Sequence, residues 1–534
     1  MQQQPDPAQL RTALTNRLCI RSILTRHLRF IGPGILASVA YLDPGNWATD
    51  LQAGSTYGYS HLCVILVSSF FAILLQILCT RLGYVTGKDL AQQCRLHLYH
   101  RARLTMFWRW GVLYPLYLIC EAGIIFTDLA ELIGSAMALN MLIPDLPLWA
   151  GVLLTSLDVF IVLLAFNSYP SSSSSSSTRI FEAAISLLVL AVFVSFAVLL
   201  AKVDPDWGKA FKGFVPSHRM VAGGGLYQAI AIIGATVMPH ALFLGSRVAI
   251  TDRTVEDDSD VNKDEEQDKT MKQIKLGDQA EDEGLAKRVQ MQSHLKHASW
   301  DLGLSLFTIA LPVNAAILIL AAAAFSREGG NADETVVADL FSAHSLLRAR
   351  LGRAAAYIFA LALLFSGQAA SITVTLAGQI VSEGFLEWRT NPIVRRLVTR
   401  LVGIVPAAVV AGAVGVKGMD TLLVGSQVAL SLALPFVIGP LLFVTSNHQT
   451  MTIDLAMDKE IVTGSQPLLS TTLPANLPLS LEGQATKELA QDNKPVPVHH
   501  SFANSRFIIA LTLAIMVVVC AANVYAIVQL ASNN

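Results

Sequence analysis

Apolar runs of roughly 20 residues or more recur along this chain, and they restrict its fold more than any other feature. A helix needs roughly 20 apolar residues to cross a bilayer core, where every backbone polar group must be satisfied internally. Only 14% of the 534 residues are charged, against about 25% in soluble proteins. The pattern predicts an all-α membrane protein with 11 transmembrane helices, at residues 31–54, 61–82, 111–139, 148–166, 180–202, 225–250, 300–325, 354–381, 397–416, 422–445 and 507–530.

The polar segments between these runs divide the chain. Residues 1–30 form a basic N-terminal tail, residues 31–446 a transmembrane core with ten spans, and residues 506–534 the eleventh helix. Residues 251–297 and 447–505 are polar, and their composition predicts disordered cytoplasmic loops. Basic residues gather before the first span and between the second and third, which places the N-terminus in the cytoplasm.

Composition also narrows the partners. The net charge of −1 shows no excess of basic residues of the kind that binds nucleic acid. The six cysteines include no C-x-x-C pair, so neither a disulfide framework nor a zinc knuckle is indicated. We find no nucleophile–base pair typical of an enzyme and expect no bound cofactor. The expected partner at this point is the lipid bilayer.

Two spans are interrupted at corresponding positions. The first contains Asp-Pro-Gly-Asn at 43–46, and the sixth contains Met-Pro-His at 238–240. Proline removes a backbone donor and clashes with the preceding turn, so each site should unwind or kink its helix. Paired interruptions in the first and sixth spans are typical of inverted-repeat transporters with a midplane site. A simple proline kink is the alternative, but an acid at mid-membrane needs a partner or a wet cavity.

The two interruptions together offer ligands for a cation. These are the Asp43 carboxylate, the Asn46 amide oxygen, the freed carbonyls of Ala40 and Ala235, and the Met238 thioether. Magnesium and calcium prefer oxygen alone, whereas a thioether favours softer ions. The set therefore predicts manganese, iron, cobalt or cadmium. Met238 as a core-filling side chain is the competing interpretation.

The third span carries three acids. Glu121, Asp128 and Glu131 are spaced by seven and three residues, which puts them on one helix face. Intramembrane acids of this kind mark ion pathways or proton relays. Structural ion pairs with Arg395 and Arg396, at the start of the ninth span, are the alternative.

Two groups near the interruptions can exchange protons. A cation that approaches Asp43 should release the proton of that carboxyl group. His240 lies one residue after Pro239 and can titrate near neutral pH. A buried histidine with satisfied hydrogen bonds is the competing interpretation.

The motifs at the two interruptions resemble those of a known family. Residues 41–50 and 234–240 are similar to the first- and sixth-helix signatures of the NRAMP proton-coupled divalent metal transporters, and residues 367–385 and 426–428 resemble their eighth- and tenth-span motifs. The resemblance implies a LeuT-like fold of two inverted five-helix repeats with an additional C-terminal helix. It implies metal ligands at Asp43, Asn46, Ala235 and Met238, joined in another conformation by Ala40 and Gln427.

The resemblance also implies a proton route. It places Asp128, Glu131, Arg395 and Arg396 on the route. The sequence departs from the family pattern at two positions. The family often has asparagine and histidine where Ala241 and Gly245 stand here. The second change bears on proton handling around the sixth helix.

These observations favour alternating-access symport of manganese, or of iron, cobalt or cadmium, with protons into the cytosol. The membrane would be the plasma membrane or an endosomal or vacuolar membrane. A cation-coupled organic-solute symporter of the same fold is one alternative, although Asp43 would repel an organic carboxylate. A non-transporting metal sensor that signals through residues 251–297 is another.

Overall fold

The computed structural model describes residues 34, 37–165, 175–250, 279–325, 339–387, 392–413, 415–454 and 499–532. The side chains of residues 158–165, 175–185, 279–290 and most of 392–400, with a few others at the range ends, lie outside this description. The predicted tail at 1–30 therefore lies outside the described residues. The first half of the chain contains α2 (Pro44–Tyr57), α3 (Leu62–Thr86), α4 (Leu90–Tyr99), α5 (Tyr114–Leu142), α6 (Leu148–Ala165), α7 (Ser175–Val203) and α8 (Trp207–Gly213).

The second half is also helical. It contains α9 (Gly225–Thr236), α11 (Gln279–Ser305), α12 (Leu311–Phe325), α13 (Leu340–Leu351), α14 (Arg353–Leu386), α15 (Pro392–Ala413), α16 (Gly415–Ser446) and α18 (Arg506–Ser532). Short 3₁₀ helices lie at Gly58–His61 and His218–Met220, and π-helical turns at Phe107–Leu113 (η2) and Leu306–Ala310. Strands β1 (Thr452–Asp454) and β2 (His499–Ser501) pair antiparallel, with Ile453 opposite His500.

Both expected interruptions are present. The first span bends at residues 40–43, and α2 begins at Pro44. Proline suits this first helical position because its missing N–H would have no helical partner there. The sixth span stops at Thr236, and its helix resumes at residues 239–250.

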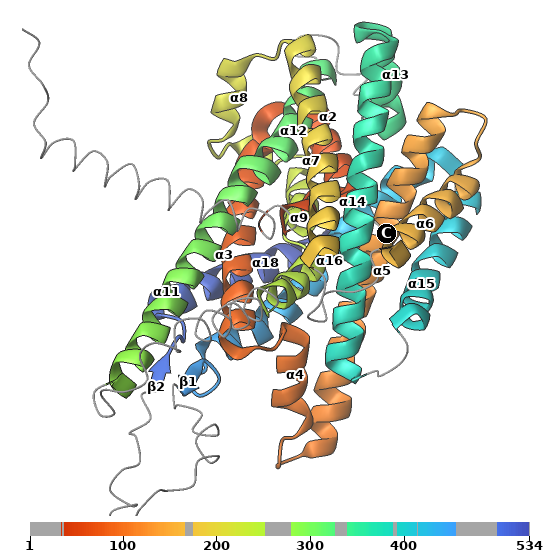
Figure 1. Ribbon diagram of the computed structural model, residues 1–534. Helices are drawn as coiled ribbons and strands as arrows, with labels where there is room; N and C mark the ends of the chain where they lie inside the picture. Colours follow the sequence, from red (N-terminus) through yellow and green to blue (C-terminus); the bar gives the residue numbers. More distant parts are fainter. Residues whose placement is uncertain are drawn as a thin grey trace, which may run out of the picture.

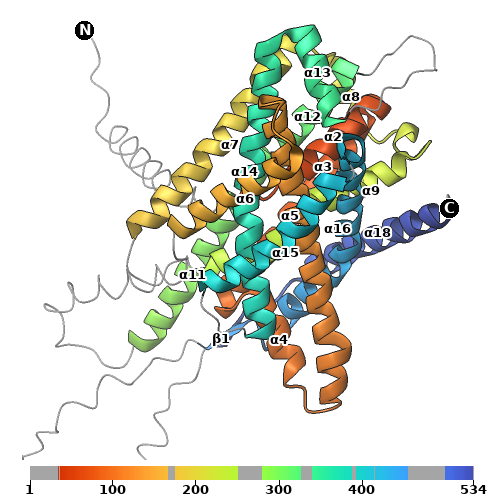
Figure 2. The same cartoon turned by 90° about the vertical axis from the view of Figure 1, so that its right-hand side faces the viewer.

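The core is a bundle in which the interrupted spans are enclosed by continuous helices. Helix α5 packs along α14 and α16, and α2 packs against α9, α12 and α16 (Figure 1). Helices α8 and α13 lie at one end of the molecule, whereas α4 and the β1–β2 pair lie at the other (Figures 1 and 2). The interruptions in α2 and α9 lie between these ends.

The two long loops differ from expectation at their margins. Residues 279–297 belong to α11, which runs on into the seventh span, so the expected loop at 251–297 ends earlier than its composition suggested. Met291 and Leu295 of α11 pack with Tyr84 of α3 and Phe502, which gives this polar helix an apolar attachment. The margins of the 447–505 loop pair as β1 and β2, and residues 455–498 lie outside the described residues.

Within the described residues, seven helical stretches are long and apolar enough to cross a membrane: Pro44–Thr86, Ser186–Val203, Gly225–Ile250, Met291–Phe325, Arg353–Leu386, Gly418–Ser446 and Arg506–Gln529. The first of them holds two expected spans joined by a short 3₁₀ turn. Shorter apolar helices lie at Leu148–Leu157 and Leu401–Ala413. The count of 11 spans stays a prediction.

Candidate functional site

Asp43 is the N-cap of α2 and is fully buried. Its Oδ2 accepts a hydrogen bond from the Gly45 N–H at 3.1 Å, and its Oδ1 accepts one from the Asn46 N–H at 3.0 Å. The carboxylate therefore satisfies donors that a helix N-terminus leaves exposed, and the helix dipole favours its negative charge. This local geometry fixes an acid in the middle of the bundle.

The carbonyls of Ala40 and Ala235 have a common property. In an uninterrupted helix each would accept from the N–H four residues later. Those positions are Pro44 and Pro239, and proline has no N–H. Both carbonyls are therefore released from helical hydrogen bonding by the same chemistry.

The neighbouring carbonyls of the first interruption already accept hydrogen bonds from side chains. The Tyr41 carbonyl accepts from the Asn46 amide at 3.0 Å and from the Asn314 amide at 3.4 Å. The Leu42 carbonyl accepts from the Ser366 hydroxyl at 2.5 Å. Side chains of α12 and α14 thus hold the unwound backbone in place.

Two amide oxygens beside Asp43 are buried and lack a hydrogen-bond partner among the described residues. They are Oδ1 of Asn46 and Oε1 of Gln427. The Gln427 amide lies against Gly45, at a place that a side chain there would fill, and the Asp43 carboxylate borders the same place. A buried acceptor without a donor costs about 1–3 kcal/mol, so two of them at one point indicate a site for a ligand.

The second interruption meets the same part of α16. The backbone of Gln427 lies directly against Gly234, two residues after Ile232 on α9. Ala235 and Met238 are both fully buried. Helix α16 therefore touches both interruptions at one residue. In the described part of the chain, no three His, Cys, Asp or Glu side chains gather as a metal cluster, so any cation here would be held by mixed donors.

The acids of α5 extend away from the first interruption. Gly134 lies against the Pro44 ring, and Glu131 is one helical turn earlier and fully buried. Asp128 is also buried, and its carboxylate lies against Gly403 of α15. The buried acids of α5 therefore lie between Pro44 at one end and Gly403 of α15 at the other.

The remaining predicted proton groups differ in how much the structure describes. Arg395 and Arg396 lie in the first turns of α15, but their side chains lie outside the described residues. Glu121 is half-buried, two turns from Asp128, and interacts with the Tyr117 hydroxyl.

His240 is fully buried, and neither ring nitrogen has a hydrogen-bond partner among the described residues. This does not match the competing interpretation of a histidine held by two hydrogen bonds within the protein. The role of His240 in proton exchange stays a prediction.

Asp50 is a candidate that the sequence reasoning missed. It is 1% exposed, and both carboxylate oxygens lack a hydrogen-bond partner among the described residues. Its place one turn after Asn46 puts it on the same face of α2. An acid in an apolar helix was the available signal.

The departure at Gly245 has a structural explanation. The Gln76 amide of α3 lies where a side chain at Gly245 would begin. Oε1 of Gln76 also accepts a long hydrogen bond of 3.5 Å from the Tyr41 hydroxyl. A glutamine from another span therefore occupies the position that a histidine often takes in the resembling family.

Comparisons with known proteins identify the family of this chain. Residues 34–457 match the model of a family described as natural resistance-associated macrophage protein-like. The chain is 38% identical over 531 residues to the manganese transporter SMF1 of Saccharomyces cerevisiae, covering 98% of this chain and 89% of that protein. It is 43% identical over 433 residues to the iron transporter SMF3 of the same yeast, covering 81% and 84%.

A solved structure shares the architecture. The crystal structure of the Eremococcus coleocola manganese transporter, in complex with an aromatic bis-isothiourea substituted compound, superimposes with a TM-score of 0.67 at 28% identity and covers 95% of this chain and 87% of that one. The expected helical fold is thereby confirmed, with the short β1–β2 pair as an addition. With a family match over most of its length and relatives well above 30% identity, the chain belongs to the natural resistance-associated macrophage protein (Nramp) family.

Proposed function

We propose that this chain carries a divalent transition-metal ion, manganese or iron foremost and also cobalt or cadmium, together with protons into the cytosol by alternating access. The relatives bear the names of manganese and iron transporters rather than of enzymes. An organic-solute symporter or a sensor has no comparable support. The plasma membrane and an endosomal or vacuolar membrane both suit this direction of transport.

The observation that carries the proposal is the pair of buried, unpartnered amide oxygens of Asn46 and Gln427 beside the Asp43 carboxylate. A divalent cation would supply what these oxygens lack. The Ala235 carbonyl and the Met238 sulfur complete the proposed shell, and in an alternative conformation the Ala40 carbonyl and the Gln427 side chain join it. The sulfur biases the site against calcium and magnesium.

Protons enter the proposal through the acids around the site. The metal displaces a proton from Asp43, and Glu131 and Asp128 carry protons away from it. The arginines of α15 lie on this route as permanent positive charges, because a guanidinium does not release its proton. His240 and Asp50 are further proton-binding groups within the bundle. Glu121 lies at the far end of this route. Inward proton movement adds driving force, since each charge gains about 2.3 kcal/mol per 100 mV.

Proteoliposomes that contain a manganese-sensitive dye and a pH dye test this proposal. We expect manganese entry and internal acidification together for the wild-type chain, and loss of both in Asn46→Ala. Asn140→Ala is the matched control, because Asn140 bonds the Leu146 carbonyl at the end of α5, away from the site. Manganese entry at the wild-type rate in Asn46→Ala would contradict the ligand assignment. Entry without acidification would contradict proton coupling alone.

A further inference from the structure

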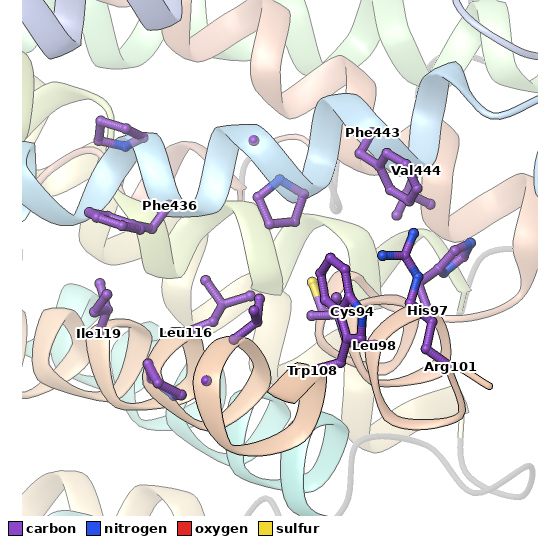
Figure 3. Close-up of a pocket in the computed structure, with 16 residues that line it drawn as sticks. Cys94, His97, Leu98, Arg101, Trp108, Leu116, Ile119, Phe436, Phe443 and Val444 are labelled. Atoms are coloured by element: carbon purple, nitrogen blue, oxygen red, sulfur yellow. The ribbon is translucent and has the colours of Figure 1, made fainter. Parts of the chain in front are cut away.

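A second cavity lies far from the interruptions, between α4, η2, α5 and α16. Its volume is about 490 Å³, within the range of about 300–1,000 Å³ that small-molecule sites occupy. Figure 3 shows residues of α5 on one side and of α16 on the other. None of the groups assigned to metal or proton transport lines it.

The long walls of this cavity are apolar. Leu116 and Ile119 of α5 face Phe436 and Phe443 of α16 (Figure 3). The two phenylalanines are 50% and 52% exposed, so the cavity borders the outer surface of the bundle that a bilayer covers. Between them, Gly439 leaves open space, because a Cβ there would meet no atom within 4 Å. Such a surface suits a hydrocarbon chain.

One end of the cavity is basic. Arg101 lies there beside His97, at the opposite end from Ile119 and Phe436 (Figure 3). Its guanidinium lies 4.0 Å from the centre of the Trp108 ring, and no carboxylate among the described residues pairs with it. His97 is already bound on both ring nitrogens, to the Gln93 carbonyl and the Thr450 hydroxyl. Arg101 is therefore the group left for an anion.

The surroundings place this basic end at a membrane–water boundary. Arg103 is exposed next to it, and Trp110 is 66% exposed in the following π-helical turn. Tryptophans and arginines of this kind mark the headgroup level. Basic clefts between helices at the cytoplasmic side recognise anionic headgroups.

We propose that this cleft binds one anionic glycerophospholipid from the leaflet at the α4 end. An acyl chain lies between Leu116 and Phe436, and the headgroup phosphate pairs with Arg101. Charge complementarity selects the anionic lipid, because Arg101 and Arg103 both lack carboxylate partners in the described part of the chain. The site is independent of the metal function proposed above.

Native mass spectrometry of the full-length chain tests the proposal, with phosphatidylglycerol and phosphatidylcholine of identical acyl chains added in equal amounts. We expect the wild-type chain to retain one phosphatidylglycerol in preference to phosphatidylcholine. Arg101→Ala should lower that preference about fivefold, since one basic residue near an anionic surface contributes about 1 kcal/mol. Arg101→Lys should restore much of it.

Gly439→Leu tests the acyl-chain part of the cleft, because the new side chain would fill its open space. Gly412→Leu is the matched control, since a Cβ at Gly412 also meets no atom within 4 Å and this glycine of α15 does not line the cavity. We expect loss of the retained lipid only in Gly439→Leu. Equal retention of the two lipids by the wild-type chain, or equal behaviour of the two glycine variants, would overturn the proposal.

A measurement on the wild-type chain avoids any folding effect of these variants. Bromine on the acyl chains of phosphatidylglycerol should quench tryptophan fluorescence more than bromine on phosphatidylcholine, because Trp108 lines the cleft. Equal quenching by the two brominated lipids would also overturn the proposal.

Discussion

Asp43 caps α2 and at the same time offers the only full charge of the proposed metal shell. The two roles can be separated, because asparagine is as good an N-cap as aspartate. We expect Asp43→Asn to fold with nearly unchanged thermal stability and to lose manganese transport. Asp43→Ala should lose transport and also about 1 kcal/mol of helix stability. The check is manganese uptake beside thermal unfolding of the same preparations.

Met238 allows a prediction about selectivity. Met238→Ala removes the only sulfur of the proposed shell. Uptake of cadmium and manganese should therefore fall strongly, whereas the ability of calcium and magnesium to compete for the site should weaken less. Met141→Ala, at a buried methionine of α5, controls for the loss of side-chain volume. Equal changes for all four ions in competition assays would show that the sulfur does not select the cargo.

Several site residues could be predicted from sequence because their cause is local. A proline fixes where each helix stops, and Asp43, Asn46 and Met238 lie within three residues of a proline. Gln427 followed only from the family resemblance, since its contact with Gly45 joins spans far apart in the chain. Asp50 was missed because its lack of partners depends on the packing of other helices.

At the scale of single elements, α4 is joined to two spans. The Leu90 N–H donates to the Ser246 hydroxyl at 3.0 Å, and Arg95 pairs with Glu387 at 3.1 Å. Asp89 caps α4 and lies 3.4 Å from the Arg247 guanidinium. Helix α4 thus links the sixth and eighth spans at one end of the molecule.

Burial raises the pKa of Asp89 to about 6, although the Gln92 N–H and Arg247 both lower it. The folded chain therefore binds this proton more tightly than the unfolded chain, whose aspartate pKa is about 3.9. Stability should fall as pH rises from about 4 to about 6, by at most about 3 kcal/mol from this group. Asp89→Asn keeps a capping side chain and should lose this part of the pH dependence. Thermal unfolding of both chains across this range measures it, and parallel curves would contradict the expectation.

Helix α15 offers a test of the proton route. A side chain at Gly403 would displace the Asp128 carboxylate, whereas one at Gly412 on the same helix would meet open space. We expect Gly403→Ala to reduce proton-coupled manganese uptake several-fold and Gly412→Ala to leave it unchanged. Initial rates in proteoliposomes under an inward proton gradient provide the measurement. Equal rates in the two variants would remove Asp128 from the route.

Among the elements, the interrupted helices were predictable and the extent of α11 was not. Proline and glycine mark the interruptions in the sequence itself. Residues 279–297 are polar, and their helix is held by a few contacts such as the stacking of His294 on Tyr84 at 4.5 Å. Contacts between distant segments of this kind leave no periodic signal in the sequence.

For the whole molecule, the distinction between transporter and sensor depends on the 251–297 segment. Residues 255–275 are mostly charged or polar, so their deletion should leave manganese uptake at the wild-type rate if the chain is a transporter. Leu295→Asp places a charge in the apolar group that joins α11 to Tyr84 and Phe502, and it should lower stability. Loss of uptake in the deletion variant, with normal thermal unfolding, would favour a regulatory role for the segment.

The Ala40 and Ala235 carbonyls can bind an ion only if the backbone nitrogen four residues later carries no hydrogen. Any residue other than proline would restore a proton at that nitrogen, and the proton would compete with the ion for the same lone pair. A net backbone hydrogen bond contributes about 1 kcal/mol, which corresponds to about a fivefold loss of metal affinity for each carbonyl recaptured. The pyrrolidine rings of Pro44 and Pro239 therefore keep an amide proton away from both carbonyls, and in the proposed site each interrupted span would have one backbone oxygen free for the ion.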